Sequence, residues 1–151
     1  MIHQSVNSPD WAGTDTSSVE TVGSGAAFLP PELCERFQSK LKSTFFHGYG
    51  SSEVVRVRPL FSRGSGGIRT DLGHKPVYES LGLLMPGLQA RIIREDGSEG
   101  GVGEPGELWV KGGSDSQGYF DDEPGTSKTF TKDGWLKTGD IFIVDERGNY
   151  Q

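Results

Sequence analysis

The fold of this chain is decided by residues 30–53, which read PPELCERFQSKLKSTFFHGYGSSE. Prolines stand where a helix begins and acidic residues follow in its first turns, so this stretch predicts a helix over 31–42. Apolar side chains recur at every fourth position and indicate one buried face: Leu29, Leu33, Phe37 and Leu41. A short strand over 44–47 follows and ends at a Gly-Tyr-Gly turn. A helix and then a strand are typical of an αβ segment.

Further along the chain, the apolar period changes to that of strands. We expect strands over 88–93, 107–111 and 141–144, each bounded by Gly or Asp-Gly turns, and a helical turn around 124–130. Residues 1–20 are polar and turn-rich, and 58–82 read as a loop rich in Gly, Ser and Arg.

Two parts of different character follow from these patterns. Residues 1–84 are predicted to be a partial αβ subdomain that carries the Gly-Tyr-Gly turn. Residues 85–151 are predicted to be a small, twisted, antiparallel β-barrel-like subdomain. The fold class is therefore α/β.

The composition disfavours several classes of function. The net charge is −6 and no basic cluster occurs, so nucleic acid is a poor partner. A single cysteine, Cys34, forms no internal disulfide, and three scattered histidines offer no zinc-ligand spacing. No stretch is long and apolar enough to span a membrane, and the start lacks the pattern of a signal peptide. We expect a cytoplasmic protein, with the peroxisome as the alternative for a full-length parent. The sequence says nothing about oligomeric state.

One motif that could carry chemistry is Gly48-Tyr49-Gly50-Ser51-Ser52-Glu53, directly after the 44–47 strand. It offers exposed backbone, an aromatic ring able to stack on a base, hydroxyls for a phosphate and a carboxylate for a hard cation. Taken alone, an ordinary strand-end turn with exposed polar residues explains it better.

A second motif is Leu136-Lys137-Thr138-Gly139-Asp140. An Asp after a tight Gly turn and before a strand can aim its carboxylate at the two hydroxyls of a ribose. A plain hairpin turn is the stronger explanation in isolation. A third motif, Gly106 to Gly112, alternates like a half-buried strand and shows no evident chemistry.

The order of these motifs is more specific than any one of them. They occur as Ser24-Gly25-Ala26-Ala27, then Gly48 to Glu53, then Gly106-Glu107-Leu108-Trp109-Val110, then Gly118-Tyr119 with Pro124 and Thr126, then Gly134 to Asp140. This series resembles the adenylate-forming (AMP-binding) superfamily, in its acyl- and aryl-CoA synthetase and luciferase branch. The resemblance extends over nearly the whole chain and implies a fragment from the latter part of that family's large N-terminal domain.

The resemblance implies a ligase that joins a small carboxylic acid to CoA with ATP and Mg²⁺, through an acyl-AMP. It implies that Tyr49 stacks on adenine, that Asp140 binds the ribose hydroxyls and that Glu53 holds magnesium. Ser52, where the family usually has Thr, is expected at the α-phosphate, which makes Ser52 and Glu53 the catalytic candidates. The remaining nucleotide-binding candidates are Ala26, Ala27, Gly48, Gly50 and Ser51, and the acid-substrate candidates are Ala27, His47 and Gly48.

Two parts of the family pattern are missing from this sequence. It contains no Ser-Gly-Thr-Thr-Gly-x-Pro-Lys-Gly run, which in the family grips the outer phosphates, and it lacks the mobile C-terminal domain with the catalytic Lys. We therefore expect negligible turnover by this chain alone. Two hypotheses remain open: an inert part of an acid–CoA ligase, or a non-catalytic module that binds a nucleotide or a partner protein.

Overall fold

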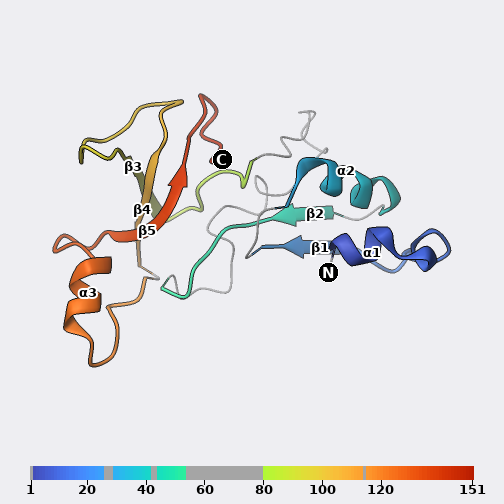
Figure 1. The fold of residues 1–151 in the computed structure, drawn as a ribbon, viewed down its shortest axis with the longest axis horizontal. Coiled ribbons are helices and arrows are strands. Elements are labelled where there is room, and N and C mark those ends of the chain that lie inside the picture. Colours follow the sequence, from blue (N-terminus) through green and yellow to red (C-terminus); the bar gives the residue numbers. More distant parts are fainter. Residues whose placement is uncertain (1, 26–28, 42–43, 54–79, 114) are drawn as a thin grey trace.

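The computed structural model describes residues 2–25, 29–41, 44–53, 80–113 and 115–151, and the side chains of 44–47 lie outside that description. The strands form two sheets (Figure 1), a parallel pair in the N-terminal half and an antiparallel group of three in the C-terminal half. Most of the loop expected over 58–82 lies outside the described residues. The boundary between residues 84 and 85 stays a prediction.

The N-terminal half is built around a parallel pair of strands joined through a helix. Strand β1 (Thr21–Ser24) pairs with β2 (Thr44–His47), and α2 (Pro31–Lys40) lies between them in the chain. Parallel strands need such a crossover connection, and a helix is the usual one. The predicted strand over 44–47 is confirmed, and the predicted helix ends two residues early, since Leu41 is already extended.

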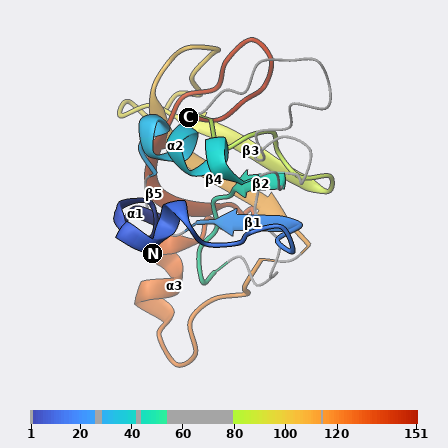
Figure 2. The ribbon, with the colours of Figure 1, turned by 90° about the vertical axis from the view of Figure 1, so that its right-hand side faces the viewer.

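Two short helices precede this unit and were not expected from the polar sequence of residues 1–20. These are α1 (Ile2–Asn7) and the 3-10 helix η1 (Pro9–Ala12). Trp11 of η1 stacks on Phe37 of α2, with ring centroids 5.2 Å apart. Figure 2 shows α1 and α2 next to each other, beside the two strands. The buried residues here form one small core: Val6, Leu29, Cys34, Phe37 and Leu41.

The C-terminal half is an antiparallel sheet in the order β3-β4-β5. Its strands are β3 (Leu88–Ile93), β4 (Gly106–Gly112) and β5 (Leu136–Phe142). Alternate residues of the central strand are buried, and they join a second core made of Ile92, Leu108, Val110, Leu136 and Phe142. The predicted antiparallel sheet is confirmed, and over the described residues it remains open rather than closing into a barrel.

The last strand differs from the prediction of a strand over 141–144. The observed strand starts at Leu136 and passes through Gly139 and Asp140, which the sequence predicted to be a turn. Gly139 has φ +77°, and the pairing of β4 with β5 shifts register between Glu107 and Trp109. Glycine with a positive φ is common in β-bulges as well as in turns. A bulge within β5 was therefore predicted to be a turn.

A short helix, α3 (Glu123–Thr129), precedes β5 and confirms the expected helical turn. The Asp122 side chain caps it by accepting a hydrogen bond from the Gly125 N–H. Helix α3 projects from one end of the sheet in both views (Figures 1 and 2). Among the described residues, none of the helices has the length and apolar character that a membrane crossing requires.

Candidate nucleotide-binding site

The turn after β2 carries Tyr49 from the first sheet to the second. The Gly48 N–H donates to the Ser24 carbonyl at 2.9 Å, which extends the parallel pairing by one step. The half-buried Tyr49 ring then packs edge-on against Phe142 of β5, with centroids 5.0 Å apart. Opposite the turn, a Cβ on Gly25 would lie 3.0 Å from the Gly48 carbonyl oxygen, so this crossing favours glycine at that position.

Two residues predicted from separate motifs meet at this point. The Tyr49 hydroxyl donates a hydrogen bond to Oδ2 of Asp140, a residue 91 positions further along the chain. Burial, and then the bond to Asp140, raise the pKa of Tyr49 above its ordinary value. The phenol therefore stays neutral and keeps its proton to donate. The structure thus brings the candidate residues for adenine and for ribose into direct contact.

The bulge that holds Asp140 is fixed by Glu107 of β4. Oε1 of Glu107 accepts the Gly139 N–H at 2.9 Å, and Oε2 accepts the Trp109 indole N–H at 2.9 Å. Thr138 adds a bond from its hydroxyl to the Leu108 carbonyl at 2.8 Å. The sequence alone predicts no role for Glu107, because its strand shows no chemistry by itself. The only signal was its place within the ordered motifs.

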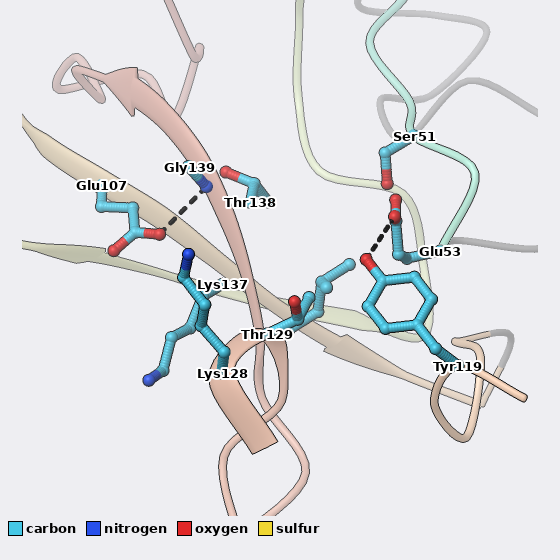
Figure 3. Close-up of a pocket in the computed structure, with 10 residues that line it drawn as sticks. Ser51, Glu53, Glu107, Tyr119, Lys128, Thr129, Lys137, Thr138 and Gly139 are labelled. Atoms are coloured by element: carbon cyan, nitrogen blue, oxygen red, sulfur yellow. Dashed lines mark hydrogen bonds between the residues drawn. The ribbon is translucent and has the colours of Figure 1, made fainter. Parts of the chain in front are cut away.

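A carboxylate from the first motif lies across from this strand. Oε1 of Glu53 accepts a hydrogen bond from the Tyr119 hydroxyl at 2.7 Å (Figure 3). This bond, followed by the Ser51 hydroxyl, lowers the pKa of Glu53, while the same bond raises the pKa of Tyr119. Glu53 is consequently ionised at neutral pH. Tyr119 is the second residue that sequence reasoning left without a role.

A cavity of about 380 Å³ separates Glu53 from β5. Its wall combines hydroxyls, carboxylates and cations (Figure 3), from Ser51, Glu53, Glu107, Tyr119, Lys128, Thr129, Leu136, Lys137, Thr138 and Gly139. Two residues of the wall, Thr138 and Gly139, directly precede Asp140. The cavity therefore starts next to the Tyr49–Asp140 contact and extends to Glu53.

The donor set fits a magnesium ion shared with phosphates better than a metal held by protein alone. Mg²⁺ in nucleotide sites is usually held by one or two carboxylates together with phosphate oxygens. Glu53 is an ionised carboxylate on the cavity wall, with the Ser51 hydroxyl beside it. Within the described ranges, no three His, Cys, Asp or Glu side chains gather closely enough to hold a metal.

The other predicted site residues lie partly outside the cavity wall and partly outside the described residues. Ser51 lines the cavity, whereas the exposed Ser52 does not belong to its wall. Gly50 is exposed, with open space where a side chain would start. His47 ends β2 opposite Ser24, with its side chain outside the description. Ala26 and Ala27 lie outside the described residues.

Comparisons with known proteins identify the family of the chain. The family model described as AMP-binding enzyme matches residues 1–120. The chain is 39% identical to 4-coumarate–CoA ligase-like 3 of Arabidopsis thaliana over 136 residues, which cover 89% of this chain and 23% of that protein. It is also 39% identical to probable 4-coumarate–CoA ligase 1 of Dictyostelium discoideum over 141 residues, covering 90% of this chain and 23% of that one.

Solved structures show the same fold. A crystal structure of an anthranilate CoA ligase in complex with anthranoyl-AMP superimposes with a TM-score of 0.83 at 21% identity, over 99% of this chain and 27% of that one. The chain spans about a quarter of the length of the curated relatives that it matches. The match of the family model to most of the sequence shows that the chain belongs to the AMP-binding enzyme family.

Proposed function

We propose that the chain supplies the nucleotide-binding part of an AMP-forming acid–CoA ligase. In that reaction a carboxylate oxygen attacks the α-phosphorus of ATP and pyrophosphate leaves, which gives an acyl-AMP. The sulfur of CoA then attacks the acyl carbonyl, loses its thiol proton and displaces AMP, which gives the thioester. The observation that supports this most strongly is the contact of Tyr49 with Asp140 at the edge of the cavity that reaches Glu53.

The spatial order of these residues matches the order of groups in a nucleotide. Tyr49 is a half-buried ring fixed edge-on by Phe142, so it is held before a base arrives to stack on it. Asp140 is exposed beside it, with a carboxylate that retains acceptor capacity for ribose hydroxyls after binding Tyr49. Ser51 and Glu53 follow on the cavity wall, where phosphates would lie, and Ser52 is adjacent in the chain.

Magnesium, when bound, neutralises charge on the phosphate oxygens. Glu53 would hold it, since its pKa is lowered and its carboxylate lies on the cavity wall. In other enzymes, removing one hydrogen-bond donor that stabilises charge in the transition state lowers the rate about 10²–10³-fold. The sequence contains no Ser-Gly-Thr-Thr-Gly-x-Pro-Lys-Gly run, which grips the outer phosphates in the family. We therefore propose that the chain binds nucleotide but does not turn over by itself.

Isothermal titration with AMP tests the binding part of the proposal. Stacking on an aromatic ring contributes about 1–3 kcal/mol per base, so Tyr49→Ala is expected to weaken AMP binding about 10-fold or more. Asp140→Ala removes a charged acceptor and is expected to do the same. Glu95→Ala is the matched control, because Glu95 is an exposed carboxylate in the turn after β3, outside the cavity wall.

The outcomes separate the two candidate functions. Loss of AMP binding in both variants, with normal binding in Glu95→Ala, supports the nucleotide site. A folded wild-type chain that binds no AMP refutes it and leaves a protein-binding module as the better explanation. Pyrophosphate exchange with a panel of fatty and aryl acids tests the second part, since exchange above background would contradict the proposed lack of turnover.

A further inference from the structure

Contacts with α3 and with Phe130 restrain Tyr119, which is 41% exposed. The Tyr119 N–H donates to the Thr126 hydroxyl at 2.8 Å, and the Tyr119 ring meets Phe130 edge-on, with centroids 6.3 Å apart. Gly118 has φ +139°, and a Cβ there would lie 2.6 Å from Thr126. Only glycine fits this close approach, which brings Tyr119 directly onto α3.

A second bond ties the same segment to Glu53. The Ser116 N–H donates to the Glu53 carbonyl oxygen at 2.7 Å, while the Tyr119 hydroxyl donates to the Glu53 carboxylate at 2.7 Å. One residue is thus held through both its backbone and its side chain by a segment more than 60 positions away. Figure 3 shows the Tyr119 hydroxyl directed at the carboxylate, with Ser51 beside it.

The two bonds to Glu53 affect how its carboxylate can bind a metal. A surface glutamate rotates freely, and fixing it costs about 1.5–2 kcal/mol in side-chain entropy. Mg²⁺ requires near-ideal octahedral geometry, so a ligand that is already oriented is favoured. A hydroxyl bound to one oxygen leaves lone pairs on the carboxylate for the ion. Partners that orient metal ligands in this way typically change metal affinity about 10–100-fold.

We infer that Tyr119 is a positioning residue that orients Glu53 toward a nucleotide-bound divalent cation. The inference rests on the proposed function, since it concerns the same site. In this role Tyr119 is not a ligand of the metal and acts on it through Glu53, while its side chain also lines the cavity. Its hydroxyl should therefore matter more to binding of the magnesium–nucleotide complex than to binding of the nucleotide without metal.

The test is isothermal titration of the 151-residue chain with ATP, once in excess EDTA and once in saturating Mg²⁺. We define the metal enhancement as the dissociation constant for ATP in EDTA divided by the dissociation constant for ATP in Mg²⁺. Tyr119→Phe keeps the ring and its contact with Phe130, and is expected to lower the enhancement about 10-fold, a larger effect than its effect on the affinity in EDTA. Glu53→Gln is expected to lower the enhancement further than Tyr119→Phe does, while the phosphate oxygens of ATP keep a measurable part of it. Tyr150→Phe, which removes a hydroxyl outside the cavity wall, is the control.

A double variant separates positioning from a general structural effect. If Tyr119 acts through Glu53, adding Tyr119→Phe to Glu53→Gln changes the enhancement no further. Additive losses, or an unchanged enhancement in Tyr119→Phe alone, overturn the inference while leaving wild-type nucleotide binding intact. A wild-type chain that binds ATP under neither condition overturns the proposed function and the inference together, so the two failures are distinguishable.

Discussion

Replacing Glu107 by alanine is expected to weaken both folding and AMP binding. Its two oxygens accept the Gly139 N–H and the Trp109 indole N–H, each at 2.9 Å. A buried hydrogen bond to a charged group contributes about 1.5–3 kcal/mol to stability. Glu107 is only partly buried, so each of its two bonds should contribute an energy near or below the lower end of that range. We therefore expect Glu107→Ala to lower the free energy of unfolding by about 2 kcal/mol. Glu107→Gln should lose about half as much, because the amide nitrogen that replaces one carboxylate oxygen cannot accept a hydrogen bond from the second donor.

Urea unfolding followed by tryptophan fluorescence measures this loss. With a denaturant slope of about 2 kcal/mol per molar, the Glu107→Ala midpoint should fall by about 1 M. Glu99→Ala serves as the matched control, since Glu99 makes an exposed ion pair with Arg91 at 3.5 Å, of a kind that adds little stability. AMP affinity should fall with Glu107→Ala, because Gly139 and the adjoining Asp140 lose their anchor. An unfolding midpoint equal to that of Glu99→Ala, together with wild-type AMP affinity, would refute the assignment of Glu107.

Gly106→Ala should destabilise the chain by about 1–3 kcal/mol in the same urea assay, because its Cβ would lie 2.6 Å from the Ile93 carbonyl oxygen; Gly113→Ala, which has open space, should be neutral. Leu108→Ala should cost about 2–5 kcal/mol by thermal or urea unfolding, since Leu108 is fully buried, and a smaller loss would argue against the C-terminal core as described. Burial raises the pKa of the Cys34 thiol to about 11, so at pH 8 Cys34 should react with a disulfide reagent far more slowly in the native chain than in urea, and faster as the pH rises toward 11. Equal rates in native and denatured protein would contradict its burial.

The elements that the sequence predicts best are those with a regular spacing of apolar residues within their own segment. Apolar spacing was enough for β3 and for most of α2, because one face of each is buried against its own neighbours. It failed for α1 and η1, which are polar in sequence and depend on packing such as that of Trp11 on Phe37. It failed again at β5, where a positive φ at Gly139 belongs to a bulge within the strand and not to a turn.

The candidate site also contains residues that a local motif predicts and residues that depend on contacts across the fold. Tyr49, Asp140 and Glu53 could be named from motif order, yet nothing local to any of them predicts that Tyr49 and Asp140 touch. Glu107 and Tyr119 act by contacts made across the fold, with Gly139 and with Glu53. A supporting side chain of this kind carries no pattern in its own segment, so only the three-dimensional structure reveals it.

The contact between Tyr49 and Asp140 also bears on how the protein is made. The ribosome adds the tyrosine 91 residues before the carboxylate that it binds, whereas Thr44 follows its β1 partner Thr21 much sooner. Contacts between distant residues form late, because a longer loop must be closed first. A nascent chain that has already paired β1 with β2 consequently still exposes the Tyr49 ring. The proposed nucleotide site is completed only after β5 has been synthesised and has paired with β4.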